Sequence, residues 1–117
     1  ISKIIKAYKN NEELSIVNNG NAIRDFIHIE DVVDIYSKIL DKKDIKILNI
    51  GSGNGSSIKN ILDFLNNHNI KIKTKNVQRE EIKISTADVS KLKELFNKDE
   101  FLSVEDYLKK ELCKWKN

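Results

Sequence analysis

The sequence predicts an α/β domain in which short strands alternate with about five helices. Segments with apolar residues at helical spacing are separated by short, nearly continuous or alternating apolar runs, which is typical of strands followed by helices. Turns rich in Asn, Gly and Ser lie between these segments. The 117 residues contain no proline and no low-complexity linker, so the sequence predicts one domain spanning residues 1–117.

The first part of the chain predicts two helices and two extended segments. Residues 1–9 carry apolar side chains at helical spacing, residues 14–17 form a short apolar strand, and an Asn-rich turn follows at residues 18–21. Residues 26–29 are predicted to be extended. Asp31 is the predicted N-cap of the second helix, because its carboxylate can accept a hydrogen bond from the first helical turn. The predicted apolar face of that helix consists of Val32, Val33, Ile35, Tyr36, Ile39 and Leu40.

The remainder of the chain continues the alternation of strands and helices. Asp88 is a predicted helix cap, and Ser103 with Asp106 resembles a capping box, in which each residue satisfies a free backbone N–H group of the other. The sequence predicts, in order, a strand at 45–50, a glycine-rich loop at 51–55, a helix capped by Ser56 or Ser57, extended segments at 70–77 and 82–84, and two further helices.

Charge and composition exclude several classes of function. The chain has 21 basic and 18 acidic residues and a net charge of +3, which is too balanced for a nucleic-acid-binding surface. No apolar run is long enough to span a bilayer, so no membrane partner is expected. Cys113 is the only cysteine, which favours a reduced, cytoplasmic location. His28 and His68 lack the partners and spacing of a zinc site, so no metal is expected.

The most specific motif runs from Arg24 to Val33 and reads R-D-F-I-H-I-E-D-V-V. It resembles the R-D-F-x-H-V-x-D-V signature in the C-terminal part of the extended short-chain dehydrogenase/reductase family. These are NAD-dependent epimerases and dehydratases of nucleotide sugars, and UDP-glucose 4-epimerases are among them. The resemblance implies that Arg24 contacts a diphosphate, for which its planar fork of donors is suited, and that His28 is structural. Taken alone, Arg24 and Asp25 would form a surface ion pair.

A second segment extends the resemblance. Arg79 is the only other arginine, and it is followed by Glu80, Glu81 and an A-D-x-S-K match at residues 87–91. In a late motif of the family, an Arg reaches the substrate phosphate and a nearby acid reaches the ribose. The resemblance therefore implies that Arg79 binds phosphate and that Glu80 or Glu81 stands in for the usual Asp. We take Glu81 as the candidate.

The strand at residues 14–17 corresponds to a family strand that runs along the nucleobase. The resemblance implies that backbone groups around Ser15 read a uracil-like edge of the base, while Val17 packs on its ring. Many members carry an aromatic residue at the position of Val17 and a glycine at that of Asn18. The five predicted substrate-binding residues are thus Arg24, Arg79, Ser15, Val17 and Glu81.

No residue of this chain is predicted to be catalytic. It has neither the Tyr-x-x-x-Lys pair nor the G-x-x-G-x-x-G loop of the family. It contains no methionine and begins with Ile1, so we expect a piece of a longer enzyme whose Rossmann half lies upstream and binds the NAD. The piece itself is expected to bind no NAD and to be inactive. An unpaired edge of the predicted strand at 45–50 would favour self-association.

The run from Asn49 to Gly55, N-I-G-S-G-N-G, supports a different hypothesis. A strand that leads through G-x-G-x-G into a helix resembles the first motif of S-adenosylmethionine-dependent methyltransferases, and such a loop can bind an anion. Against this, Gln78 and not an acidic residue ends the next predicted strand. A non-enzymatic nucleotide-binding module is the third hypothesis. The sequence does not choose the sugar, the base or the reaction.

Overall fold

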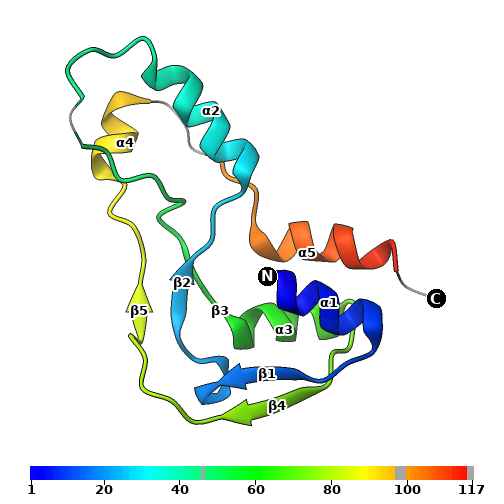
Figure 1. Ribbon diagram of the computed structural model, residues 1–117. Coiled ribbons are helices and arrows are strands. Elements are labelled where there is room, and N and C mark those ends of the chain that lie inside the picture. The colour runs from blue at the N-terminus through cyan, green and yellow to red at the C-terminus, as the bar shows by residue number, and fades with distance from the viewer. Residues whose placement is uncertain (46, 97–99, 116–117) are drawn as a thin grey trace.

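Five α-helices and five short strands build the described part of the chain, which comprises residues 1–45, 47–96 and 100–115 of a computed structural model (Figure 1). This arrangement confirms the predicted α/β class. The elements are α1 (Ser2–Asn10), β1 (Leu14–Val17), the 3-10 turn η1 (Asn18–Gly20), β2 (Ile23–Asp25), α2 (Ile29–Ile39), β3 (Gly55–Ser57), α3 (Ile58–Asn67), β4 (Thr74–Val77), β5 (Ile84–Ser85), α4 (Ser90–Leu95) and α5 (Val104–Cys113).

The strands form two small sheets. β1 and β4 pair in parallel, with Leu14 opposite Thr74 and Val17 opposite Val77. In the other sheet, β2 lies between β3, to which it is antiparallel, and β5, to which it is parallel. Because these strands contain only two to four residues, the helices and loops packed against them must supply most of the stability.

The molecule is elongated and has two lobes. Its extents are 48 × 34 × 20 Å and its radius of gyration is 16.4 Å, whereas a compact domain of this length would have about 13 Å. One lobe contains α1, α3, α5, β1 and β4; α2 and α4 form the other, at the top of Figure 1, and the strand β2 leads from the first lobe to the second.

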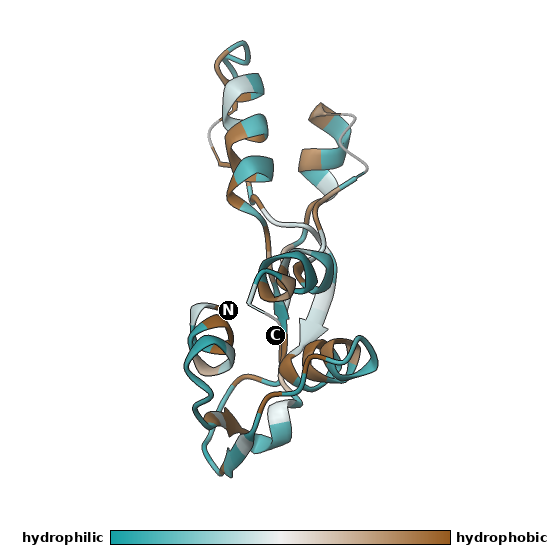
Figure 2. Cartoon of the chain, turned by 90° about the vertical axis from the view of Figure 1, so that its right-hand side faces the viewer, coloured by the Kyte–Doolittle hydropathy of each residue, from teal (hydrophilic) through white to brown (hydrophobic). Residues whose placement is uncertain are grey.

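The larger hydrophobic core lies in the first lobe, where apolar faces of α1, α3 and α5 converge (Figure 2). Ile61 and Leu65 of α3 and Leu108 and Leu112 of α5 have no exposed surface. Burying side chains of this size stabilises the fold by about 1.5–3 kcal/mol each. The buried members of this core are Ile4, Ala7, Leu14, Ile61, Leu65, Ile70, Leu108 and Leu112.

The smaller core joins α2 to α4 and has only four buried members, Ile35, Val89, Leu92 and Phe96. The prediction of a single apolar face for this helix is therefore wrong in part, because α2 has two apolar faces. Ile35 and Ile39 point to α4 and its surroundings, whereas another set of side chains on α2 faces solvent. This exposed stripe consists of Ile29, Val33, Tyr36 and Leu40, which are 67%, 58%, 58% and 85% exposed.

The helix caps decide where the elements begin. As predicted, the Ser57 hydroxyl accepts a hydrogen bond from Asn60 N–H, and the Ser103 hydroxyl accepts one from Asp106 N–H. The prediction for Asp31 was wrong, because α2 begins at Ile29, three residues earlier than expected, and His28 is its cap. Asp31 is instead 6% exposed, and its carboxylate accepts a hydrogen bond at 2.9 Å from Leu102 N–H. It thus ties α2 to the segment that leads into α5.

Several predicted strands are shorter than expected or absent. Residue 45 and residues 47–50 form no strand, and Lys46 lies outside the described residues. The Ile47 carbonyl accepts a hydrogen bond from the Lys91 side chain rather than from a strand. Apolar composition alone does not make a strand, since a ladder needs a partner at the right distance. For the same reason only residues 74–77 of the predicted segment 70–77 pair in a sheet.

Candidate functional site

Four of the five predicted binding residues line one pocket. Ser15 and Val17 of β1, Arg24 of β2 and Glu81 surround a hollow of about 240 Å³ between the β1 strand and α1. A more open hollow of about 830 Å³ adjoins it, is lined by Arg79, and shares Ala22 and Glu81 with the first. The fold therefore brings together residues that are up to 66 positions apart in the chain, from Ser15 to Glu81.

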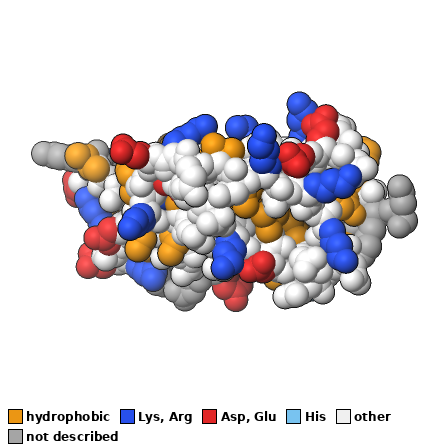
Figure 3. Space-filling view, turned by 90° about the horizontal axis from the view of Figure 1, so that it is seen from below, with side chains coloured by type: hydrophobic (Ala, Val, Ile, Leu, Met, Phe, Trp, Pro, Cys, Tyr) orange, Lys and Arg blue, Asp and Glu red, His pale blue; other side chains and the backbone are white. Residues whose placement is uncertain are grey.

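The two joined hollows are lined by four basic residues and by two acidic ones, Glu80 and Glu81. Lys3 and Arg24 line the smaller one, and Arg79 and Lys83 line the larger one. Figure 3 views the molecule from below Figure 1 and shows scattered basic side chains, some with acidic side chains beside them, and hydrophobic side chains exposed between them. A local cluster of this kind suits a small anion with an apolar part better than a long polyanion, which needs a continuous basic track.

Arg24 is half-buried in the middle strand of its sheet, opposite Ser56 of β3 and Ser85 of β5. One guanidinium nitrogen, Nη1, donates a hydrogen bond at 2.9 Å to the carbonyl of Ile23. Within the described residues, Arg24 forms no ion pair with an acidic side chain. The surface ion pair with Asp25, considered for these two residues from sequence, is therefore wrong, and most guanidinium donors remain available to a ligand.

Asp25 has a different role, which the sequence did not reveal. Its carboxylate accepts four hydrogen bonds: from Ser52 N–H at 3.0 Å, Ser52 Oγ–H at 2.6 Å, Gly53 N–H at 2.9 Å and Ala87 N–H at 3.1 Å. Burial alone raises the pKa of this carboxyl, but the hydrogen bonds from Ser52, Gly53 and Ala87 outweigh it and lower the pKa below 3.8. Asp25 thus joins β2 to the glycine-rich loop and to residue 87.

The glycine-rich loop packs against its neighbours rather than forming an anion site. A side chain at Gly51 would come within 2.5 Å of the Ala87 Cβ, and one at Gly55 within 2.3 Å of a methyl group of Ile23. The N–H groups of Ser52 and Gly53, which such a loop would offer to a phosphate or a cofactor, already donate to Asp25. This arrangement does not fit the methyltransferase motif, which requires an open loop.

The loop that carries Arg79 and Glu81 is joined to the end of β1. The side chain of Asn18 accepts a hydrogen bond at 3.0 Å from Arg79 N–H and donates one to the Arg79 carbonyl. Its Nδ2 also lies 3.4 Å from Oε1 of Glu81. The Arg79 and Glu81 side chains are exposed beside the larger hollow. The only sequence signal for this contact was an Asn at a position where the family commonly has Gly.

The other predicted polar residues have structural contacts. His28 Nδ1 accepts a hydrogen bond at 3.0 Å from Glu30 N–H, and its ring lies edge-on to Tyr107 with centroids 5.2 Å apart. Both residues line a hollow of about 460 Å³ that is otherwise largely apolar. Cys113 is exposed. Among the residues that the structure describes, no group of three or more His, Cys, Asp or Glu could hold a metal ion. No described helix could cross a membrane.

Comparison with known proteins shows which proteins this chain resembles. Residues 1–51 match the family described as "NAD dependent epimerase/dehydratase family". UDP-glucuronate 4-epimerase of Thermodesulfobacterium geofontis is 30% identical over 114 residues, which are 94% of this chain and 35% of that protein. A putative UDP-arabinose 4-epimerase of Arabidopsis thaliana is 38% identical over 48 residues, covering 38% of this chain and 12% of that protein.

Solved structures of the same class share the fold. UDP-glucuronic acid 4-epimerase from Bacillus cereus, in complex with UDP-glucuronic acid and NAD, has a TM-score of 0.80 and 27% identity over 97% of this chain and 38% of that chain. MoeE5, in complex with UDP-glucuronic acid and NAD, has a TM-score of 0.81 over 97% of this chain and 40% of that chain. Its identity of 23% supports the fold alone.

The chain thus shares the fold of a part of Rossmann-type epimerases and dehydratases. The family match over residues 1–51 and the similarity of nearly the whole chain to these epimerases agree with the resemblance that the motif beginning at Arg24 indicated. The chain spans about a third of the length of the T. geofontis relative, 35%.

Proposed function

We propose that residues 1–117 are the substrate-binding, C-terminal portion of an NAD-dependent epimerase or dehydratase, that the substrate is a UDP-sugar, and that Arg24 and Arg79 hold its diphosphate. The observation that carries this proposal is the meeting of Ser15, Val17, Arg24 and Glu81 around one pocket. These residues were selected from sequence motifs, and their convergence in space is independent of that selection.

In this proposal, each residue contacts a different part of the nucleotide. Ser15 and Val17 are two positions apart on β1, so they share one face of the strand and can border a flat base. Val17 offers an apolar surface to the ring, and the carboxylate of Glu81 can accept hydrogen bonds from ribose hydroxyls. Arg24 and Arg79 then neutralise the diphosphate. Fixing the nucleotide in this way would orient the sugar for the reaction without a catalytic group from this chain.

The catalytic residues and the NAD site would lie in a Rossmann half that packs against this portion. The exposed stripe of α2 supports such a partner, since Ile29, Val33, Tyr36 and Leu40 repeat at spacings of four, three and four residues and are all exposed. A row of apolar side chains at this spacing is suited to packing on another element. Without that partner, the stripe would drive self-association of the chain. A reducing, cytoplasmic location is part of this proposal, and the presence of a single cysteine supports it.

The binding experiment separates this proposal from its alternatives. Calorimetric titration of the chain with UDP, a UDP-sugar and S-adenosylmethionine should detect binding of the first two. Substituting Arg24→Ala should weaken UDP binding by about 1.5–3 kcal/mol, or about 10- to 150-fold, because it removes charged hydrogen bonds. Lys38→Ala removes the same charge from α2, far from the pocket lining, and should leave the affinity unchanged.

The outcomes are distinct. If Arg24→Ala and the unmodified chain bind UDP with equal affinity, Arg24 has a structural role and does not contact the diphosphate. Binding of S-adenosylmethionine in place of UDP would favour the methyltransferase hypothesis. Binding of UDP by the chain, with no turnover of a UDP-sugar even when a Rossmann half of the family is supplied, would favour a nucleotide-binding module that is not an enzyme.

A further inference from the structure

Asn18 stands at the point where β1 ends and the chain turns into η1. Its φ is 48°, in the left-handed region that glycine and asparagine tolerate best. A glycine could adopt this backbone conformation equally well. The backbone turn therefore does not by itself require the side chain of Asn18, and the contacts of that side chain need a separate explanation.

The Asn18 amide forms a two-point contact with the backbone of Arg79. Its Oδ1 accepts a hydrogen bond at 3.0 Å from Arg79 N–H, and its Nδ2 donates to the Arg79 carbonyl. The orientation of the amide is unambiguous, because a backbone N–H can only donate and a carbonyl oxygen can only accept. A side-chain amide used in this way imitates one residue of a strand, with one donor and one acceptor.

This contact continues the β1–β4 ladder past its last backbone pair. The ladder ends with Val17 opposite Val77, and Asn18 and Arg79 are the next residues to be joined. A second contact runs in the opposite direction, because Asn19 N–H donates to Oδ1 of Asn76 at 2.7 Å. The exposed loop after β4 is thus fastened to η1 at its first residues. Without the Asn18 side chain, the backbone of Arg79 would lose both of these hydrogen bonds and would sample many positions.

We propose that Asn18 is a positioning residue for the nucleotide diphosphate and ribose, acting through Arg79 and Glu81. By fixing the Arg79 backbone and approaching Glu81 Oε1 at 3.4 Å, it holds both loop residues beside the larger hollow before the ligand arrives. This inference rests on the proposed function, and it assigns the pre-ordering of the loop to Asn18, which borders the larger hollow itself and stands where the family commonly has a glycine.

The matched variants are Asn18→Gly and Asn19→Gly. Both remove an asparagine side chain from positive φ in the same turn, since Asn19 has a φ of 60°, but the Asn19 side chain forms no hydrogen bond with a described residue. In calorimetric titration with UDP, Asn18→Gly should bind about 3- to 10-fold more weakly than the unmodified chain, while Asn19→Gly should bind within about twofold of it.

A double-mutant cycle with Arg79→Ala separates positioning from a general loss of structure. In the unmodified chain, Arg79→Ala should weaken UDP binding about tenfold or more. In the Asn18→Gly background, the same substitution should weaken UDP binding only about twofold, because the arginine is already misplaced. Equal effects of Arg79→Ala in both backgrounds would overturn the proposal. So would equal UDP affinities of Asn18→Gly and Asn19→Gly.

Hydrogen exchange of the Arg79 amide gives a readout that needs no ligand. This amide should exchange about tenfold faster in Asn18→Gly than in Asn19→Gly, and an unchanged rate would overturn the proposal. If the unmodified chain does not bind UDP, the proposed function fails and the role of Asn18 fails with it. If it binds UDP but the cycle shows no coupling, only the role of Asn18 fails.

Discussion

Asp25→Asn tests whether one carboxylate joins the central strand to the glycine-rich loop. The substitution keeps the size of the side chain but replaces one acceptor oxygen with an N–H₂ group. If the amide nitrogen takes the place of Oδ2, the N–H groups of Gly53 and Ala87 lose their acceptor. If the nitrogen takes the place of Oδ1, the N–H group of Ser52 loses its acceptor. Either orientation leaves at least one backbone N–H facing another donor. At about 1–3 kcal/mol for each unsatisfied group, the free energy of unfolding should fall by about 2–3 kcal/mol.

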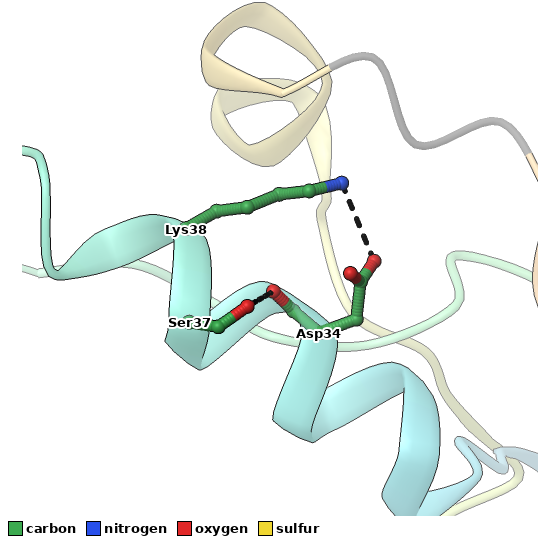
Figure 4. Close-up of polar contacts among 3 residues, drawn as sticks. All are labelled: Asp34, Ser37 and Lys38. Carbon is green, nitrogen blue, oxygen red and sulfur yellow. Dashed lines mark hydrogen bonds and ion pairs between the residues drawn. The ribbon is translucent and has the colours of Figure 1, made fainter.

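The assay is urea unfolding followed by circular dichroism at pH 7, with Asp34→Asn as the control. Asp34 forms an exposed ion pair on α2, in which its Oδ2 lies 3.3 Å from Lys38 Nζ, while Ser37 Oγ–H donates to its backbone carbonyl (Figure 4). An exposed pair of this kind contributes about 0.3–0.5 kcal/mol, so the control should unfold near the midpoint of the unmodified chain. Equal losses for Asp25→Asn and Asp34→Asn would refute the reasoning.

The same variant predicts a pH dependence with a definite sign. Because the pKa of Asp25 is lowered in the folded chain, its stabilising contribution is complete above the unfolded value of about 4 and is lost as the pH falls through the folded pKa. A protonated Asp25 carboxyl resembles the amide of the variant in its ability to donate and accept. The difference in unfolding free energy between the unmodified chain and Asp25→Asn should therefore narrow below about pH 4. A difference that stays constant from pH 7 to pH 3 would contradict this account.

Three further substitutions test the packing, the cap and the exposed stripe. Gly55→Ala should lower the free energy of unfolding in urea titration by about 1–3 kcal/mol, because the new Cβ would lie 2.3 Å from a methyl group of Ile23. A loss below about 0.5 kcal/mol would show that the neighbouring strand moves to make room. Ser57→Ala should cost about 1 kcal/mol in the same assay by leaving Asn60 N–H uncapped, and no loss would mean that water replaces the hydroxyl. Val33→Asp should reduce self-association of the chain in light scattering, whereas Asp63→Asn, at an exposed position of α3, should not. Equal masses of the two variants would show that the exposed stripe does not cause self-association.

Sequence patterns predicted correctly those features that depend only on neighbouring residues. Ser57 and Ser103 cap helices as predicted, because a hydroxyl before a helical run needs only the next three residues to find its partner. The short strand Leu14–Val17 and the turn after it also follow from neighbouring residues. The substrate-binding residues were selected by motif, and the fold brings four of them to one pocket.

The errors concern contacts between distant segments. Asp31 was expected to cap a helix, but its carboxylate bonds to the backbone of Leu102, 71 residues away. For Asp25 the sequence offered only a surface pair with Arg24 as an alternative, but its partners lie 27, 28 and 62 residues away. Periodicity cannot reveal such partners, because it reports only which face of an element is apolar. It also failed for the run from Ile45 to Ile50, whose apolar residues find no neighbouring strand among the described residues.

The most direct test of the central claim is a titration of the ¹⁵N-labelled chain with UDP, followed by nuclear magnetic resonance. We expect saturable shifts of the backbone amides of the predicted binding residues, which are Ser15, Val17, Arg24, Arg79 and Glu81. The amides of Ser52 and Gly53 should change little, because their N–H groups donate to Asp25. Shifts centred on Ser52 and Gly53, or no shifts at millimolar UDP, would contradict the claim that this chain binds a nucleotide through its two arginines.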